Sequence, residues 1–366
     1  RVLHRARTLE AIGVDLVLAA FHRTKMPDLT VGSWESIDLG RTVDEAYLHR
    51  LKSMIGASRT IWRNRGKFKD ANGLIGRNIE QLMLARLIRL ITRRKIPLAY
   101  ECLGIHGMMI GDSPVSKIVR AAERWCLNHC ELVVVSSTAF VDEYFKPIQN
   151  FAGDWQLIEN KFAPSFANTP RPPACTAPKG GPLRIGWFAM LRCSKSFDML
   201  MQIADARPDG VEIIIRGVPT VINEQDFYKR IDERANVRYG GPYKNPEDLA
   251  QIYDDIDLTW VIDFFEEGFC SEWLLPNRLY ESGFFGVPML TREATATAQY
   301  AKERDLGWTI PEPIVQSTIR MCDSLDTVEY ERVAANIAQL PNSAWVEDDE
   351  AARLVRRLTG ETVLSP

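Results

Sequence analysis

Pro276-Asn277-Arg278-Leu279-Tyr280-Glu281-Ser282-Gly283-Phe284-Phe285-Gly286-Val287-Pro288-Met289-Leu290 combines the start of a helix, a carboxylate and a strand within fifteen residues. Pro276 suits the first turn of a helix, because its missing N–H group would have no partner there. Gly286 is expected to end the helix, and the apolar run 287–290 is typical of a buried parallel strand. A helix that leads directly into a buried strand predicts an α/β fold.

The start of this predicted helix has the chemistry of an anion site. The free amides of its first turn, with Asn277 and Arg278 beside them, suit a phosphate group. Glu281 lies one turn further along the same helix face, where a carboxylate can accept hydrogen bonds from ribose hydroxyls. The segment therefore predicts a site for a nucleotide diphosphate.

The same segment resembles the signature P-N-[KR]-[LF]-[FY]-E-…-G-x-P in the C-terminal domain of GT-B glycosyltransferases, especially glycosyltransferase family 4. In that family the matching Glu holds the ribose of the nucleotide-sugar donor, a role that the resemblance implies for Glu281. The stretch 183–196 is similar to the first strand and loop of the same domain. There an Arg and a Lys grip the donor diphosphate, and Arg192 and Lys195 match them.

The residues between these two matches depart from the family pattern. Family 4 usually carries two Glu separated by seven residues, but the residue eight positions before Glu281 is Trp273. Glu272 is one residue out of register, and Glu267 resembles the usual Glu-Gly-Phe run but stands fourteen residues before Glu281. An insertion after Glu267 would reconcile the spacing, and we take Glu267 as the candidate catalytic carboxylate that contacts the donor sugar.

His106 is the candidate catalytic residue of the first half. It follows a predicted strand at 97–103, and the resemblance places it at the rim of the cleft. Family members often have a His or an acidic residue here, near the donor sugar and the acceptor. The acidic residue often seen two positions earlier is Gly104 in this chain. A structural histidine at a strand end is the alternative interpretation.

Strands and helices alternate through both halves of the chain. The apolar runs predict strands at 14–21, 97–103, 131–136, 155–160, 183–188, 211–216, 257–262 and 287–290, and helical spacing predicts helices that include 72–94 and 114–129. The simplest architecture is α/β, with two doubly wound Rossmann-like domains that face a central cleft, which is the GT-B fold.

The domain boundaries follow from composition. We expect an N-terminal acceptor-side domain at 1–163, a linker at 164–182 that is rich in Pro and small residues, and a nucleotide-sugar-binding domain at 183–340. A C-terminal helix within 341–366 could pack back on the first domain. The sequence begins within a predicted helix, so the strand that normally opens this fold is expected to be missing from it.

Composition narrows the class of protein. The 366 residues, 46% hydrophobic and 25% charged, are typical of a soluble chain with two domains. No apolar run approaches the roughly 18 residues that cross a membrane. Seven scattered Cys predict no disulfide framework and favour a reducing cytoplasm. Cys126, His129 and Cys130 could be metal ligands, but no second pair with zinc spacing follows, so we predict no metal site.

Charge is divided unevenly between the halves. Residues 1–163 contain 24 Lys and Arg against 17 Asp and Glu, whereas the remainder contains 21 against 31. Eleven basic residues and two acidic ones lie within 59–95, interleaved with apolar residues. This stretch could lie on an anionic membrane surface, and a solvated helix face is the alternative. A pI of about 6.1 and the lack of a recognisable module argue against nucleic acid as a partner.

We therefore predict a cytoplasmic GT-B glycosyltransferase that moves a hexose from a UDP- or GDP-linked donor to a saccharide acceptor in polysaccharide biosynthesis. The acceptor is expected to be lipid-linked, with the enzyme peripheral on the inner face of the plasma membrane. The resemblance implies retention of anomeric configuration and donor diphosphate binding by Arg192 and Lys195. The chemistry of the helix start predicts that Asn277 and Arg278 bind the same diphosphate, and we expect no cofactor besides the donor. The alternatives are a GT-B sugar-nucleotide epimerase and a non-catalytic GT-B-like binding subunit.

Overall fold

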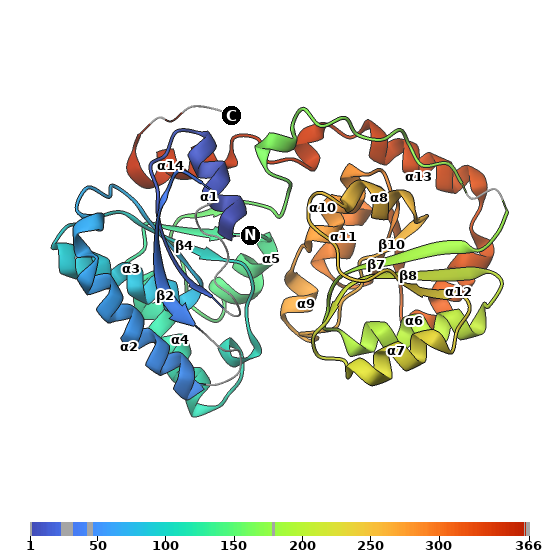
Figure 1. The fold of residues 1–366 in the computed structure, drawn as a ribbon, viewed down its shortest axis with the longest axis horizontal. Helices are drawn as coiled ribbons and strands as arrows, with labels where there is room; N and C mark the ends of the chain where they lie inside the picture. The colour runs from blue at the N-terminus through green and yellow to red at the C-terminus, as the bar shows by residue number, and fades with distance from the viewer. Residues whose placement is uncertain (1, 23–31, 42–46, 178–179, 362, 364–366) are drawn as a thin grey trace. The chain divides into compact units, whose positions relative to one another are not determined.

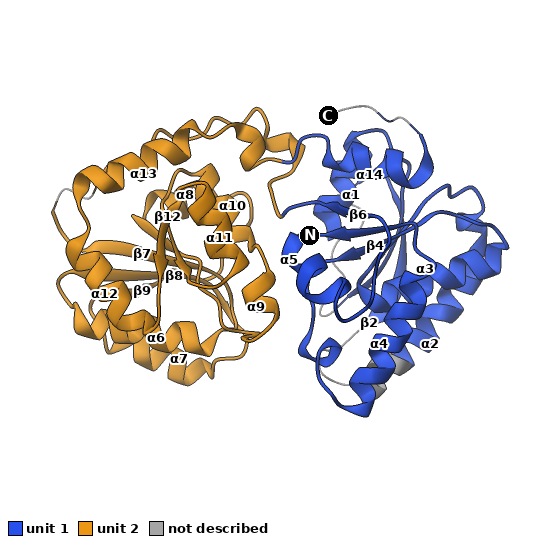
Figure 2. Cartoon of the chain, turned by 180° about the vertical axis from the view of Figure 1, so that it is seen from behind, with its two compact units in different colours: residues 1–159, 347–366 blue, residues 160–346 orange. Residues whose placement is uncertain are grey.

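A computed structural model describes residues 2–22, 32–41, 47–177, 180–361 and 363, with the backbone alone for 47–51 (Figure 1). The chain divides into two compact units (Figure 2). The first unit contains residues 1–159 and 347–366, and the second contains residues 160–346. None of the described helices combines the length and apolar character needed to cross a membrane.

The first unit contains a four-stranded parallel sheet and a separate parallel pair of strands. The sheet has the order β3 (Leu74–Arg77), β4 (Leu98–Cys102), β5 (Leu132–Val135), β6 (Trp155–Leu157), and the pair is β1 (Val17–His22) and β2 (Glu35–Arg41). The helices of the first unit are α1 (Val2–Ala11), α2 (Tyr47–Arg63), α3 (Asn78–Thr92), α4 (Pro114–Leu127), α5 (Thr138–Phe140) and α14 (Glu350–Thr359). Short helical turns are η1 (Arg65–Phe68), η2 (Gly107–Met109) and η3 (Val141–Phe145).

Local sequence explains several of these elements. Every residue of β5 is buried, as expected for an apolar strand in the middle of a parallel sheet. Helix α4 has Pro114 in its first turn, and the Oγ of Ser113 accepts a hydrogen bond from the amide of Ser116 at 3.0 Å. The C-terminal helix α14 packs Leu354 and Leu358 into the core formed with the sheet.

A buried ion cluster joins distant parts of the first unit. Glu101 of β4, 2% exposed, accepts from Arg5 of α1 at 3.3 Å and from Arg77 of β3 at 2.7 Å. Arg5 also contacts Glu347 at 2.8 Å, in the segment before α14. Burial acts to raise the pKa of Glu101, but the two guanidinium groups outweigh it and lower that pKa to about 2. The Glu101 carboxylate is therefore part of the framework that holds this unit together.

The second unit contains a six-stranded parallel sheet in the order β12-β11-β10-β7-β8-β9. The strands are β7 (Leu183–Leu191), β8 (Val211–Pro219), β9 (Val237–Tyr239), β10 (Leu258–Trp260), β11 (Met289–Arg292) and β12 (Gly307–Ile310). The helices are α6 (Ser194–Ala206), α7 (Glu224–Asp232), α8 (Leu249–Asp254), α9 (Cys270–Trp273), α10 (Asn277–Phe284), α11 (Ala296–Glu303), α12 (Ile314–Ser324) and α13 (Thr327–Gln339), with turns η4 (Pro164–Phe166) and η5 (Asn342–Ala344).

Helices cover both faces of this sheet. Helices α6, α7 and α12 lie on one face, and α8, α10 and α11 lie on the other (Figures 1 and 2). Each layer has its own core: Phe197 and Phe227 belong to the first, and Tyr253 and Phe284 to the second. The predicted α/β class with parallel sheets is confirmed, and the six-stranded sheet of the second unit is doubly wound.

The unit boundaries differ from the predicted domain boundaries 163/164 and 340/341. The chain passes into the second unit after Glu159, because the Phe162 ring packs on Phe284 with centroids 4.9 Å apart. The expected linker 164–182 also belongs to the second unit, where Arg171 donates to the carbonyl oxygens of Leu340 and Ile337 at 2.7 and 2.8 Å. The return to the first unit follows Val346, since Trp345 and Val346 are core residues of the second.

Two local predictions are corrected. The expected helix 72–94 is instead β3 followed by α3, because Leu74 to Arg77 pair in parallel with β4 and that tertiary contact overrides the helical pattern. Pro276 is the N-cap residue of α10, with φ −75° and ψ 158°, rather than a residue of its first turn. The helix thus begins at Asn277, and the relation between its first turn and Glu281 is unchanged.

Candidate functional site

The strand order of the second unit locates a candidate site. From β7 the chain proceeds through β8 and β9 toward one edge of the sheet, and from β10 it proceeds through β11 and β12 toward the other. The order therefore reverses between β7 and β10, which are hydrogen-bonded neighbours. Ligands of open α/β sheets bind outside the carboxyl ends of the strands at such a switch point. Arg192 and Glu267 lie in the loops that follow β7 and β10, and Lys195 lies in the first turn of α6, directly after the first of these loops.

The turn after β7 leads directly into helix α6. Cys193 is the N-cap residue, and its Sγ accepts a hydrogen bond from the amide of Ser196 at 3.3 Å. The amide of Phe264 donates to the same sulfur at 3.3 Å, which ties the loop after β10 to the start of α6. This arrangement places the N-terminus of a long helix, with its partial positive charge, at the switch point.

Three of the predicted site residues lie on these two loops and the start of α6, and two of them, Lys195 and Glu267, are in contact. The Nζ of Lys195 donates to both carboxylate oxygens of Glu267, at 2.8 and 2.9 Å, and lies 4.3 Å from the centroid of the Phe264 ring. The guanidinium group of Arg192 lies 4.3 Å from the centroid of the adjacent Phe265 ring. All three charged side chains are exposed, so they can reach a ligand at this edge of the sheet.

The two predicted site residues in the first turn of α10, Asn277 and Arg278, differ in exposure to solvent. Asn277 is exposed, whereas Arg278 is 7% exposed. The Nη2 of Arg278 donates to the carbonyl oxygens of Val261 and Ile262 at 3.0 and 3.2 Å and lies 3.4 Å from a carboxylate oxygen of Asp263. Arg278 thus holds the chain where it leaves β10. The diphosphate-binding role of Asn277 and Arg278 stays a prediction.

Glu281 is buried one turn further along α10, with an exposed fraction of 6%. Its Oε1 accepts a hydrogen bond from the side-chain amide of Asn245 at 2.7 Å, and its Oε2 accepts from the hydroxyl of Tyr253 at 3.3 Å. Burial, and next the Glu281 charge, raise the pKa of Tyr253 and of Tyr243, so both phenols stay protonated donors. The Glu281 carboxylate thus accepts from one amide and one hydroxyl group, donors of the kind that ribose hydroxyls provide.

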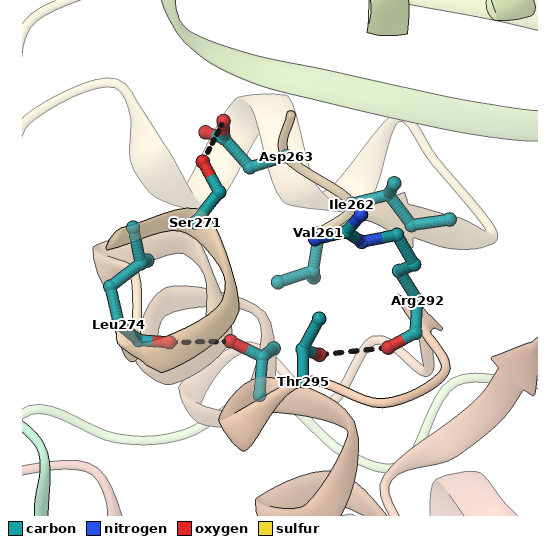
Figure 3. Close-up of a pocket in the computed structure, with 8 residues that line it drawn as sticks. Val261, Ile262, Asp263, Ser271, Leu274, Arg292 and Thr295 are labelled. Atoms are coloured by element: carbon teal, nitrogen blue, oxygen red, sulfur yellow. Dashed lines mark hydrogen bonds between the residues drawn. The ribbon is translucent and has the colours of Figure 1, made fainter. Parts of the chain in front are cut away.

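Sequence reasoning missed Arg292, which ends β11 and lines a small cavity beside Asp263 (Figure 3). Its guanidinium group lies 4.4 Å from the centroid of the Phe264 ring and contacts Glu267 at 3.5 Å. A cation two positions after the predicted strand 287–290 was the available signal, since a residue at the carboxyl end of a parallel strand lies at the ligand-binding edge of the sheet. Asn245 was missed as well, because nothing in its local sequence indicates contact with Glu281.

His106 belongs to the first unit, whereas the other candidates belong to the second. It is exposed, follows β4 and occupies the N-cap position of η2, where its carbonyl oxygen accepts from the amide of Met109 at 2.7 Å. Its catalytic role, like that of Glu267, stays a prediction. Within the described parts of both units, no group of three or more His, Cys, Asp and Glu side chains could hold a metal ion.

Comparison with known proteins gives relatives in both sequence and structure. No family model matches the chain. The succinoglycan biosynthesis protein ExoL of Rhizobium meliloti (strain 1021) is 34% identical over 369 residues, which cover 100% of this chain and 92% of ExoL.

Solved structures share the fold at low sequence identity. A sucrose-phosphate synthase from Thermosynechococcus elongatus superimposes with a TM-score of 0.70 at 13% identity, covering 94% of this chain and 88% of that one. WaaG, a glycosyltransferase involved in lipopolysaccharide biosynthesis, gives 0.67 at 13% identity, covering 98% and 95%. Anabaena HepE in complex with UDP-glucose gives 0.60 at 15% identity, covering 94% and 98%. The predicted GT-B fold is confirmed.

Proposed function

This chain belongs to the family of the succinoglycan biosynthesis protein ExoL, within the GT-B glycosyltransferases, and we propose that it moves a hexose from a nucleotide-diphosphate sugar onto a lipid-linked saccharide. The name of ExoL supports an exopolysaccharide of the succinoglycan type as the product. The UDP-glucose bound to HepE supports a UDP-hexose as the first donor to test. No observation favours the epimerase or the non-catalytic subunit.

The observation that carries the proposal is that the second unit contains both the buried Glu281 carboxylate and exposed cations at the switch point. Glu281 accepts hydrogen bonds from neutral donors that ribose hydroxyls could replace. Lys195 and Arg192 lie at the start of α6, on the strand-end edge where the diphosphate of a bound donor would be placed. One ligand with a ribose and a diphosphate satisfies both groups.

The proposed catalysis is mainly electrostatic. When the glycosidic bond of the donor breaks, negative charge develops on the leaving diphosphate, and Lys195, Arg192 and the first amides of α6 stabilise it. Glu267 accepts hydrogen bonds from Lys195, and a diphosphate would compete with that carboxylate for the same Nζ. We further propose that the reaction retains anomeric configuration and requires no metal ion.

A binding panel tests the donor. Purified protein is titrated with UDP, GDP, UDP-glucose, UDP-galactose and GDP-mannose while its melting temperature is measured, because only a ligand that binds the folded state raises it. We expect one nucleotide and one of its sugars to raise the melting temperature, with or without EDTA. If no nucleotide does so, the donor site is wrong. Adding membrane extract and a labelled donor then distinguishes labelled lipid, expected of a transferase, from the altered sugar nucleotide that an epimerase would give.

We also propose that the first unit binds the inner face of the membrane that carries the acceptor. Helix α3 packs against both α2 and α4, and Arg86 of α3 lies 3.6 Å from the centroid of the Trp125 ring of α4. Large apolar side chains are exposed on all three helices: Ile55, Trp62, Met83, Leu90, Val115, Ile118 and Trp125. Exposed basic residues accompany them, including Arg59, Arg63 and Lys117. Apolar and basic side chains together suit an anionic lipid surface.

Charge reversal on α2 tests this surface. Arg59→Glu with Arg63→Glu should weaken binding to vesicles of phosphatidylglycerol and phosphatidylcholine at least tenfold, since each basic residue contributes on the order of 1 kcal/mol. Sedimentation with vesicles measures the effect, and Lys229→Glu with Lys302→Glu, both exposed in the second unit, is the matched control. If wild-type protein sediments equally with neutral and anionic vesicles, the basic stretch is only a solvated face.

A further inference from the structure

Arg292 has hydrogen-bonding capacity that the described residues leave unused. The residue is 9% exposed, and its Nε and Nη2 are buried and make no hydrogen bond to any described residue. These two nitrogens lie on the same edge of the planar guanidinium group, so they can donate side by side. A buried donor without an acceptor destabilises a folded protein, so such a group requires an explanation.

The cavity beside Arg292 shows what size of group could accept from it. The guanidinium group points toward a cavity of about 10 Å³, which Asp263 and Ser271 also line (Figure 3). That space is close to the roughly 10–15 Å³ that a single water molecule needs. A single oxygen atom fits it, whereas a phosphate group does not.

The charges around Arg292 indicate the chemistry of this oxygen. Carboxylate oxygens of Glu267 and Glu272 lie 3.5 and 3.6 Å from the two terminal nitrogens, and Asp263 lines the same cavity. These three carboxylates would repel an anionic ligand. A hydroxyl group can accept from the guanidinium edge and donate to a carboxylate, so it satisfies both kinds of neighbour.

We propose that Arg292 binds a hydroxyl group of the transferred hexose and is a specificity residue for the donor sugar. This inference rests on the proposed function, because it places the sugar beside the diphosphate site formed by Lys195. The Phe264 ring connects the two positions: its centroid lies 4.3 Å from the Lys195 ammonium and 4.4 Å from the Arg292 guanidinium. In the absence of donor, a water molecule would occupy the hydroxyl position and leave when the sugar enters.

The test separates the sugar from the nucleotide. Calorimetric titration of wild type, Arg292→Lys and Arg292→Gln with UDP, UDP-glucose, UDP-galactose, GDP and GDP-mannose gives the gain in affinity that the sugar adds to its nucleotide. Lysine keeps the charge without the paired edge, and glutamine keeps an amide donor without the charge. We expect both variants to lose about tenfold or more of affinity for the sugar nucleotide, with less than twofold change for the free nucleotide. Arg332→Lys, which alters an exposed ion pair with Asp305, is the control.

The possible results contradict different claims. Equal losses for nucleotide and sugar nucleotide would place Arg292 at the diphosphate, and no loss would leave it a structural residue; either result overturns the proposal. Failure of wild type to bind any of the five compounds would instead overturn the proposed function. If both variants fail to fold, the deoxy analogues of the preferred sugar nucleotide are titrated into wild type. Removal of one hydroxyl should then cost about tenfold, and a series with no such position also overturns the proposal.

Discussion

Two buried glutamates, one in each unit, differ in the groups that bind them. Glu101 in the first unit is 2% exposed and accepts from two guanidinium groups, those of Arg5 and Arg77. Glu281 in the second unit is 6% exposed and accepts from the amide of Asn245 and the hydroxyl of Tyr253. Equal burial therefore does not imply an equal role.

The difference lies in whether the partners can be exchanged. Removal of one member of a buried ion pair leaves an uncompensated charge and destabilises the fold. Glu101 therefore cannot exchange its arginine partners for a ligand without a loss of stability. An amide or a hydroxyl can be replaced by a ribose hydroxyl at little net cost, because one neutral donor substitutes for another. Glu101 therefore serves the fold, and Glu281 is placed to serve a ligand.

The largest expected effect on stability is that of Glu101→Gln. The substitution leaves Arg77 without its carboxylate partner and Arg5 with Glu347 alone, and we expect a loss of about 3–5 kcal/mol in the free energy of unfolding at pH 7. Because the pKa of Glu101 is lowered to about 2 in the fold, its contribution is complete above the ordinary value of 4.5 and declines as the pH falls toward 2. Urea unfolding of both proteins between pH 7 and pH 3 measures this.

The stability difference between wild type and Glu101→Gln should therefore shrink below about pH 4.5. Glu143→Gln, an exposed glutamate of the same unit, should stay within about 0.5 kcal/mol of wild type at every pH. A difference that is large but independent of pH would mean that packing, rather than the ion cluster, accounts for the loss.

Glu281→Gln should change stability little and nucleotide affinity strongly, in contrast to Glu101→Gln. The amide keeps the size of the side chain and can still meet Tyr253, so we expect about 1 kcal/mol or less of lost stability. Affinity for the nucleotide should fall tenfold or more, since hydrogen bonds to a charged group are worth about 1.5–3 kcal/mol. Calorimetric titration measures the affinity, with Glu331→Gln on an exposed face of α13 as the matched control. Unchanged affinity for every nucleotide would contradict the proposal that α10 binds the nucleotide-sugar donor.

The fold was largely predictable because its strands are apolar and its helices have clear ends. The run Leu132–Val135 has no other plausible place than a buried strand, and Ser113 with Pro114 indicates the start of α4. Strand β3 was missed, because Leu74–Arg77 leads without a break into the amphipathic pattern of α3. Only pairing with β4 makes it a strand, and pairing is a tertiary property.

The sequence indicates site candidates where one short segment contains both the residue and its context. Glu281 follows from its position one turn beyond a helix start, whereas Lys195 is implied only by the family resemblance, and the roles of both stay predictions. Asn245 reaches Glu281 across 36 residues, and Arg292 reaches Glu267 across 25, so no local pattern indicates either contact. Such contacts depend on the order in which β7, β10 and β11 lie in the sheet.

Lys195→Ala should have the smallest effect on stability. Its partner Glu267 differs from both Glu101 and Glu281, because its carboxylate is exposed rather than buried. That carboxylate is exposed, and its ion pair with Lys195 is open to solvent on both sides, with side-chain exposures of 44% and 45%. Exposed pairs of this kind contribute little, so the free energy of unfolding should change by less than about 1 kcal/mol.

Turnover should respond to Lys195→Ala much more strongly than stability does. If Lys195 stabilises the charge of the leaving diphosphate, kcat should fall on the order of tenfold to a hundredfold while KM for the donor changes less, since the charge is greatest in the transition state. Transfer from a labelled donor to membrane-extract acceptor gives both constants. Lys229→Ala, an exposed lysine 3.9 Å from Glu233 on α7, controls for the loss of a surface cation. Equal changes in kcat and in donor affinity would place Lys195 at the ground-state diphosphate instead, and no change in either would make it, like Lys229, a surface residue.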